Sequence, residues 1–65
     1  MIEPGTRVEL VSMDDEYTRL RPGEQGVITA IRYIAYLDTT QVWVQWDNGS
    51  YLALLDGIDG YREVA

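Results

Sequence analysis

The chain has 65 residues, with 11 Asp or Glu against 5 Arg or Lys, a net charge of −6 and 46% hydrophobic residues. This length allows one domain with a single core, spanning residues 1–65. Because the sequence contains no Cys and no His, it excludes disulfides, thiolate metal sites, cysteine nucleophiles and imidazole chemistry. The acidic balance disfavours direct nucleic-acid binding, which needs a basic surface along the phosphate backbone.

The start of the chain and its hydropathy bear on its location. Residues 1–5 lack the basic start and the apolar run of a secretory signal. No apolar stretch approaches the roughly 20 residues that span a bilayer. We therefore expect a cytoplasmic protein without membrane association.

Apolar alternation predicts the first strand over residues 6–11, after a turn at residues 3–5. Residues 12–20 lack a clear period and are expected to form an ordered loop whose apolar side chains contact the core. Pro22-Gly23 then predicts a type II turn, since Pro sets φ at the first central position and Gly allows positive φ at the second.

A second, long strand is predicted over residues 27–37. Gly26 precedes it, and the missing side chain lets the backbone bend or approach another strand closely. Strict alternation breaks between Ile28 and Ile31, which predicts a bulge near Ala30. A turn at residues 38–40 follows.

The next strand has two distinct faces. Val42, Val44 and Trp46 alternate with Trp43 and Gln45, which is the period of two expected for a half-buried strand. The first three residues are predicted to face the core, and Trp43 is therefore predicted to face outward.

Asn48-Gly49 favours a type I′ turn, in which both central residues have positive φ. The return strand is predicted over residues 50–55. Asp-Gly pairs at 56–57 and 59–60 predict tight turns or one 3₁₀ turn, before a last strand over residues 61–64. Five short strands without helical periodicity predict an all-β fold, a small closed or half-open barrel.

Three segments carry a family resemblance: Met13-Asp14-Asp15 with Tyr17-Thr18, the Pro22-Gly23 and Gly26 pattern, and Trp46-Asp47-Asn48-Gly49-Ser50. Together they resemble a family of small SH3-like domains of unknown function that occurs in bacteria, their phages and mobile elements. The resemblance covers about residues 5–61 and implies a small five-stranded SH3-like barrel. Because the family has no assigned activity, it implies no catalytic or binding residue. The segment 33–41 is longer here than the family's usual hairpin.

Acidic clusters raise the question of a metal site or of acid–base catalysis. Asp14-Asp15-Glu16 offers the carboxylates that hard cations prefer, but three adjacent acids on a loop cannot all point inward. Asp56 and Asp59 lack the spacing of a calcium loop. Turn formation accounts for both groups, and a chain this short has little room for a water-excluding cleft. We predict no metal, no cofactor and no enzymatic activity.

Trp43 leads to the functional hypothesis. If it faces outward, Tyr33 or Tyr36 on the preceding strand is expected beside it, with Arg32 near them. Trp, Tyr and Arg dominate the hot spots of protein interfaces. These four residues are predicted to form a contact surface for a protein partner or for a second copy of the chain. The alternative is that the fold is a sandwich with two buried sides, or that a longer loop of the same chain covers Trp43.

The first hypothesis is therefore a non-enzymatic protein-interaction module, for which the resemblance implies an accessory role in a phage or mobile element. A second is a small-ligand protein in which Arg7, Arg19, Arg21 and Arg32 hold a nucleotide-like anion and tyrosines stack on its base. The third is nucleic-acid binding, because Pro-Gly-x-x-Gly also resembles KOW-type barrels. It requires a positive face, which the net charge disfavours.

Overall fold

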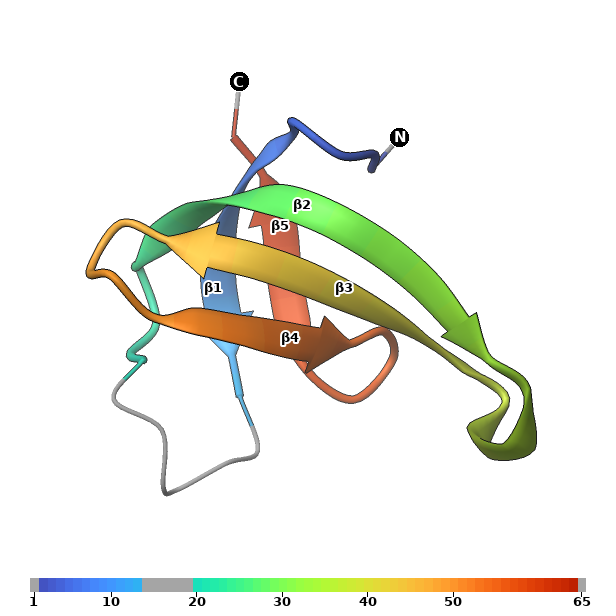
Figure 1. The fold of residues 1–65 in the computed structure, drawn as a ribbon. Helices are drawn as coiled ribbons and strands as arrows, with labels where there is room; N and C mark the ends of the chain where they lie inside the picture. Colours follow the sequence, from blue (N-terminus) through green and yellow to red (C-terminus); the bar gives the residue numbers. More distant parts are fainter. Residues whose placement is uncertain (1, 14–19, 65) are drawn as a thin grey trace.

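The computed structural model describes residues 2–13 and 20–64, which form five strands and one short 3₁₀ turn (Figure 1). In chain order these are β1 (Arg7–Ser12), β2 (Gln25–Ile34), η1 (Ala35–Leu37), β3 (Thr39–Trp46), β4 (Tyr51–Leu55) and β5 (Gly60–Glu63). They form one sheet in the order β4-β3-β2-β1-β5, and all neighbouring strands are antiparallel. The prediction of an all-β fold with five strands is confirmed.

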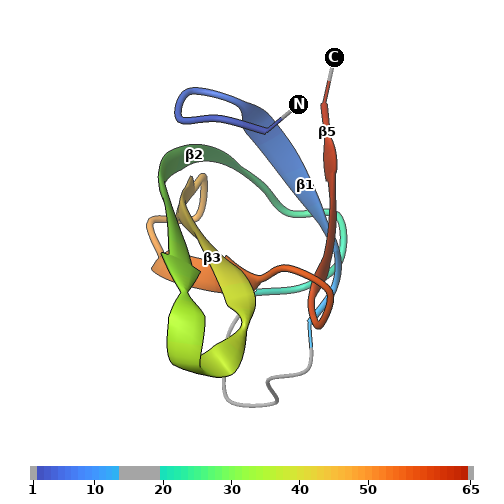
Figure 2. The same ribbon diagram turned by 90° about the vertical axis from the view of Figure 1, so that its right-hand side faces the viewer.

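The sheet curls around its core as an SH3-like barrel that remains open. Figure 2 shows β1 and β5 on one side and β2 and β3 on the other. The sheet ends at β4 on one edge and at β5 on the other, and these two strands do not pair with each other. Both termini lie at the same end of the molecule (Figure 1).

The core contains the residues that alternation places on the inner face. Val42, Val44 and Trp46 are at most 1% exposed, as predicted for β3. The other buried hydrophobic residues are Val8, Leu10, Leu20, Ile28 and Leu54. Met13 packs against this cluster, so both described apolar residues of the predicted loop contact the core. The middle of that loop, residues 14–19, lies outside the described residues.

The bend of β2 has the predicted cause. The pairing register between β2 and β3 shifts between Ile28 and Ala30, which is the expected bulge. At Gly26 the two strands come so close that a Cβ atom would lie 2.6 Å from the carbonyl oxygen of Gln45 and 2.8 Å from the Cα of Trp46. Only a glycine fits there.

The turn between β3 and β4 differs from the prediction. Gly49 has a φ of +93°, but Asn48 does not have the positive φ that a type I′ turn requires. Instead the Gly49 N–H donates to the Trp46 carbonyl at 3.0 Å, and the Asn48 side chain accepts from the Ser50 N–H at 2.9 Å. These bonds define a three-residue loop, a type I turn followed by a glycine in the left-handed region.

The hairpin between β2 and β3 projects from the body of the barrel (Figure 1). β2 ends at Ile34, three residues before the predicted end, and η1 follows. Asp38 then adopts a left-handed conformation with φ +48°, and its N–H donates to the Ala35 carbonyl at 3.1 Å. The Tyr33 hydroxyl donates to the Asp38 carboxylate at 2.6 Å, which ties the tip to the strand.

Pro22-Gly23 forms the predicted type II turn, with Gly23 at φ +98° and the Glu24 N–H donating to the Arg21 carbonyl at 3.1 Å. Within residues 2–13 and 20–64, no helix has the length and apolar character needed to cross a bilayer.

Candidate functional site

Charge is unevenly distributed over the sheet. Strands β2, β3 and β4 contain no Asp and no Glu, and Arg32 is their single charged residue. All 11 acidic residues therefore lie elsewhere in a chain of net charge −6. A negatively charged group that approaches the outer surface of these three strands therefore meets no carboxylate from the strands themselves.

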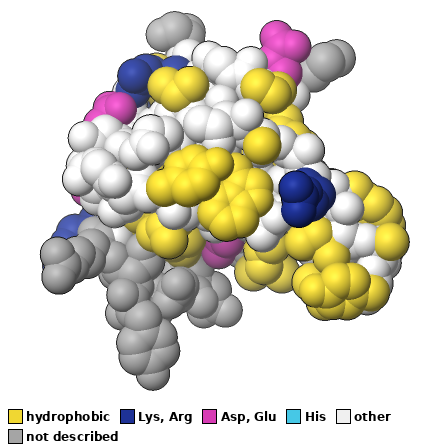
Figure 3. Space-filling view, viewed as in Figure 1, with side chains coloured by type: hydrophobic (Ala, Val, Ile, Leu, Met, Phe, Trp, Pro, Cys, Tyr) yellow, Lys and Arg dark blue, Asp and Glu magenta, His cyan; other side chains and the backbone are white. Residues whose placement is uncertain are grey.

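An aromatic pair occupies the middle of this surface. Trp43 lies opposite Ala30 on β2 and Ala53 on β4, and these small side chains leave room for its indole ring. Tyr51 stacks on the indole with ring centroids 5.2 Å apart and an angle of 22° between the planes. Figure 3 shows hydrophobic side chains at the centre of this side of the molecule, with a basic side chain beside them.

Hydrogen bonds hold both ends of the aromatic pair. The Trp43 indole N–H donates to the side-chain oxygen of Gln41 at 2.9 Å. The Tyr51 hydroxyl lies 2.9 Å from the Thr29 hydroxyl, within hydrogen-bonding distance. Thr29 sits at the β2 bulge. The two rings are thus ordered before any ligand arrives, which lowers the entropy cost of binding.

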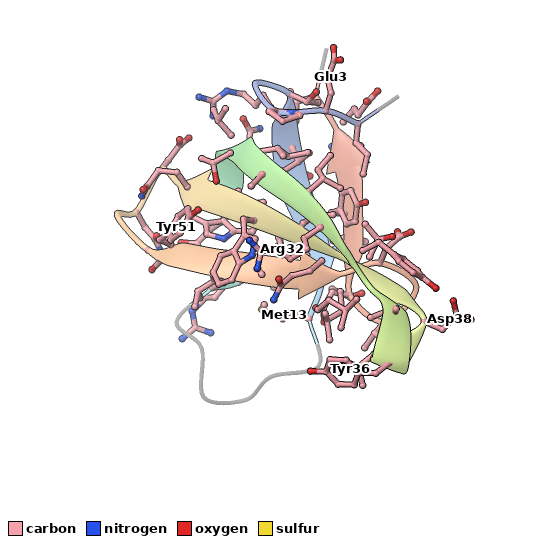
Figure 4. The ribbon with its side chains drawn as sticks, turned by 45° about the vertical axis from the view of Figure 1, so that its right-hand side comes forward. Glu3, Met13, Arg32, Tyr36, Asp38 and Tyr51 are labelled. Atoms are coloured by element: carbon pink, nitrogen blue, oxygen red, sulfur yellow. The ribbon has the colours of Figure 1, made fainter. Side chains whose placement is uncertain are left out.

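Arg32 extends the surface toward the hairpin. It lies directly opposite Gln41, is exposed and forms no ion pair with a carboxylate of the described residues. In Figure 4 it lies between Tyr51 on β4 and Tyr36 at the hairpin. An open depression of about 370 Å³ beside it is lined by Arg32, Tyr33, Ile34, Ala35, Tyr36 and Gln41.

We call the set Ala30, Arg32, Gln41, Trp43 and Tyr51 the aromatic face. Gln41 connects its two parts, because its side chain both lines the depression and accepts from the Trp43 indole. The face offers a rigid aromatic surface, a guanidinium that can take a carboxylate, and an amide. These groups suit recognition of an apolar side chain next to an acidic one.

The structure groups the four predicted contact residues only in part. Arg32, Tyr33 and Tyr36 line the depression, and Trp43 lies on the outer surface of β3, half-buried. The expectation that Tyr33 or Tyr36 lies beside Trp43 is wrong. Tyr33 is opposite Thr40, on the other side of β2 from Arg32, and Tyr36 is 87% exposed in η1.

Sequence reasoning missed Tyr51, Gln41 and Thr29. The sequence places Tyr51 on the return strand but does not give its facing direction, which depends on the turn type. The alternation of Gln41, Trp43 and Gln45 does identify Gln41 as a neighbour of Trp43, since residues two apart on a strand share a face.

Two tyrosines have raised pKa values. A hydrogen bond to Asp38 raises the pKa of Tyr33 above 10.0, with a smaller contribution from desolvation. Burial raises the pKa of Tyr61, and the nearby carboxylates of Asp56 and Glu63 raise it further. Both phenols are therefore protonated at neutral pH and act as hydrogen-bond donors.

Acidic side chains in the described part of the chain serve the fold. Asp59 accepts from the Leu55 N–H at 2.9 Å, and Asp56 accepts from the Tyr61 hydroxyl at 3.4 Å, as expected of turn residues. Residues 2–13 and 20–64 contain no group of three or more His, Cys, Asp or Glu side chains that could hold a metal ion. Asp14, Asp15 and Glu16 lie outside the described residues.

Comparison with known proteins identifies the family. A family model described as a domain of unknown function, DUF4314, matches residues 2–64. The chain belongs to the DUF4314 family. No curated protein and no solved structure matches it significantly. Because DUF4314 is defined without an activity, the function of this member is argued from the aromatic face.

Proposed function

We propose that this DUF4314 domain is a non-enzymatic protein-interaction module that binds an extended segment of a partner protein on its aromatic face. The observation that carries the proposal is an exposed Arg32 that pairs with no carboxylate among the described residues, next to an aromatic pair that hydrogen bonds hold in place. Aromatic and Arg side chains supply most of the binding energy in protein interfaces.

The chemistry of the face defines the partner segment. A partner carboxylate can form paired hydrogen bonds with the Arg32 guanidinium. An apolar or proline side chain next to it can pack on Trp43 and Tyr51, whose rings lie on the next two strands of the sheet, β3 and β4. An extended segment suits this spacing, because its side chains also recur along a line.

Two pools of synthetic peptides test the proposal. They share the same proline, aliphatic and aromatic residues, but one has Asp and Glu and the other has Lys and Arg at the charged positions. In an NMR titration, we expect the acidic pool to shift the indole N–H resonance of Trp43. The indole of the buried Trp46 is an internal control and should shift far less.

Two charge-reversal variants sharpen the test. Arg32→Glu should weaken binding of the acidic pool about tenfold or more, because it removes the guanidinium and adds repulsion. Arg21→Glu makes the same change of charge on the turn before β2 and should leave binding unchanged. Equal binding of both pools, or equal loss in both variants, would show that the face does not select an acidic segment.

The anion-binding alternative calls for several arginines at one concavity. Of the described residues, Arg32 is the single arginine that lines the depression, and Arg7 forms an ion pair with Asp47 at 2.9 Å. Titration with ATP under the same conditions tests this alternative, and we expect no shift at Trp43 or Tyr36.

An accessory role in a phage or mobile element, with a host protein as partner, is part of the same proposal and rests on the resemblance alone. Gene neighbourhoods of DUF4314 members check it. Members scattered among housekeeping genes, away from prophages and mobile elements, would count against this role.

A further inference from the structure

The free edge of β4 has backbone groups that the fold leaves unused. The Trp46 N–H donates to the Ser50 carbonyl at 2.9 Å, and the Asp56 N–H donates to the Thr40 carbonyl at 2.9 Å. Between these bonds the register of β3 and β4 runs without a shift. Hydrogen-bonded pairs in an antiparallel ladder recur at every second residue. The even-numbered residues of β4 therefore bond to β3, and the odd-numbered residues point to the edge.

One end of this edge is already occupied. The Leu55 N–H donates to the Asp59 carboxylate at 2.9 Å, and the Leu55 carbonyl accepts from Ile58 at 3.1 Å and from Asp59 at 2.9 Å. Tyr51 and Ala53 also direct their N–H and carbonyl groups to the edge, and no described residue bonds to them. The edge thus offers two donors and two acceptors.

The β4 edge also lacks the features that keep sheet edges apart. Proteins place charged residues, prolines or bulges on exposed edge strands to prevent pairing with other chains. β4 has none of these in its sequence Tyr-Leu-Ala-Leu-Leu, and its register is regular. The opposite edge strand, β5, carries Arg62 and Glu63.

We propose that β4 pairs with β4 of a second copy of the chain, antiparallel about a two-fold axis, with Tyr51 opposite Ala53 of the second copy. This register gives every free edge group a partner and forms four hydrogen bonds. Placing Ala53 opposite Ala53 would align Tyr51 with Leu55, whose groups are taken, and would leave only two bonds. A self-complementary edge selects a second copy over an unrelated strand.

Side chains and charge fit the same contact. On the outer surface, the Tyr51 ring of one copy lies beside the small Ala53 side chain of the other. On the inner surface, the half-buried Leu52 side chains of the two copies meet at the axis. Two chains of charge −6 repel each other, but here they meet along an uncharged strand. Added salt should therefore strengthen the dimer by screening the remaining repulsion.

This contact goes beyond the proposed function and does not depend on it. It rests on the backbone N–H and carbonyl groups of β4, whereas partner binding uses the side chains of Arg32, Trp43 and Tyr51. The continuous sheet would place both aromatic faces on one side, so that a partner with two acidic segments could bind both. The variants that test the two proposals are different, so either proposal can fail alone.

Sedimentation equilibrium over a range of concentrations tests the dimer. We expect the mass to rise from 7.4 kDa toward twice that value, and further with added salt. Ala53→Pro removes an N–H that points to the edge and leaves the bonds to β3 intact. It should weaken the dimer about tenfold or more, because each dimer loses two hydrogen bonds. A mass that stays at 7.4 kDa at every concentration would overturn the proposal.

A matched pair of charge variants localises the contact. Ala53→Glu brings two carboxylates into the interface and should abolish the dimer, whereas Val11→Glu adds the same group at an exposed position of β1 and should leave it intact. Circular dichroism confirms that each variant is folded. A dimer that survives Ala53→Glu but is lost in Trp43→Ala would place the contact on the aromatic face instead.

Amide hydrogen exchange tests the pairing of β4 in the unmodified chain. The amides of Tyr51 and Ala53 should exchange quickly in dilute solution and become protected as concentration rises. Protection that also appears in β5 would indicate head-to-tail pairing of β4 with β5 and would contradict the two-fold contact. Unchanged exchange at both amides would contradict any pairing through β4.

Discussion

The two halves of the sheet share one core but have different outer surfaces. In the half formed by β1 and β5, Glu9 lies opposite Arg62 and forms an ion pair with it at 2.9 Å. In the half formed by β2, β3 and β4, the outer surface holds a stacked Trp–Tyr pair and one arginine without a carboxylate partner in the described chain.

This difference keeps carboxylates off the strands that carry the aromatic face. The acidic residues lie in β1, in β5 and in the segments before and between the strands. Two of them, Asp47 and Glu9, pair with Arg7 and Arg62. The half formed by β2, β3 and β4 then presents its aromatic face without competing carboxylates on the same strands. The net charge of −6 therefore does not describe the aromatic face, whose strands carry one charged residue, Arg32.

The largest loss of folding stability is expected from a substitution in the core that both halves share. Trp46 is 1% exposed, and its indole N–H donates to the Leu52 carbonyl at 3.3 Å. Trp46→Ala should cost about 3–5 kcal/mol, which matches the whole stability of a domain this small, roughly 3–5 kcal/mol. Circular dichroism should show an unfolded chain at 25 °C. A cooperative thermal transition close to that of the unmodified chain would contradict the assignment of Trp46 to the core.

The next largest loss of folding stability is expected from substitution of two glycines, one in each half of the sheet. Gly26→Ala places a Cβ against backbone atoms at 2.6 and 2.8 Å and should cost about 1–3 kcal/mol. Gly60→Ala meets the end of the Ser12 side chain at 2.6 Å, which can rotate away, so the loss should be smaller. Urea unfolding of the two variants measures the difference. Equal losses would mean that the close approach of β2 and β3 is not the decisive constraint.

A smaller effect is expected on the aromatic face. Trp43→Ala removes a stacked pair and one hydrogen bond at a half-buried position and should cost about 1 kcal/mol of folding stability. Binding of the acidic peptides should be lost, although the domain stays folded. Urea unfolding measures the first quantity and NMR titration the second. A loss as large as that of Trp46→Ala would show that the face is part of the core.

The smallest expected effect is a loss of folding stability at alkaline pH. The pKa of Tyr61 is raised in the folded state, so the unfolded chain releases this proton first as pH rises through about 10. Stability should be complete below pH 10 and should fall as pH rises toward the folded pKa. Tyr61→Phe should flatten this part of the profile, measured by urea unfolding at each pH. An unchanged slope in the variant would assign the effect to another group.

Local patterns predicted most of the fold because they act within a few residues. Alternation identified the inner residues Val42, Val44 and Trp46, and the break in alternation placed the bulge near Ala30. The Pro22-Gly23 turn was also predictable, since proline and glycine restrict φ directly. The predicted end of β2 was less accurate. The strand ends at Ile34 and not at residue 37, because η1 and the Tyr33–Asp38 hydrogen bond form the hairpin tip.

The sequence by itself determined that Trp43 lies on the surface opposite to the core, because a strand has a period of two. Only the tertiary structure decided what lies beside it. A two-residue turn at Asn48-Gly49 would pair Trp46 with Tyr51 and direct that tyrosine inward. The three-residue loop shifts the register by one, so that Gln45 pairs with Tyr51 and the ring stacks on Trp43. The three-residue loop, held by the bond from Gly49 to Trp46 and by the bond from Ser50 to Asn48, therefore sets the composition of the aromatic face.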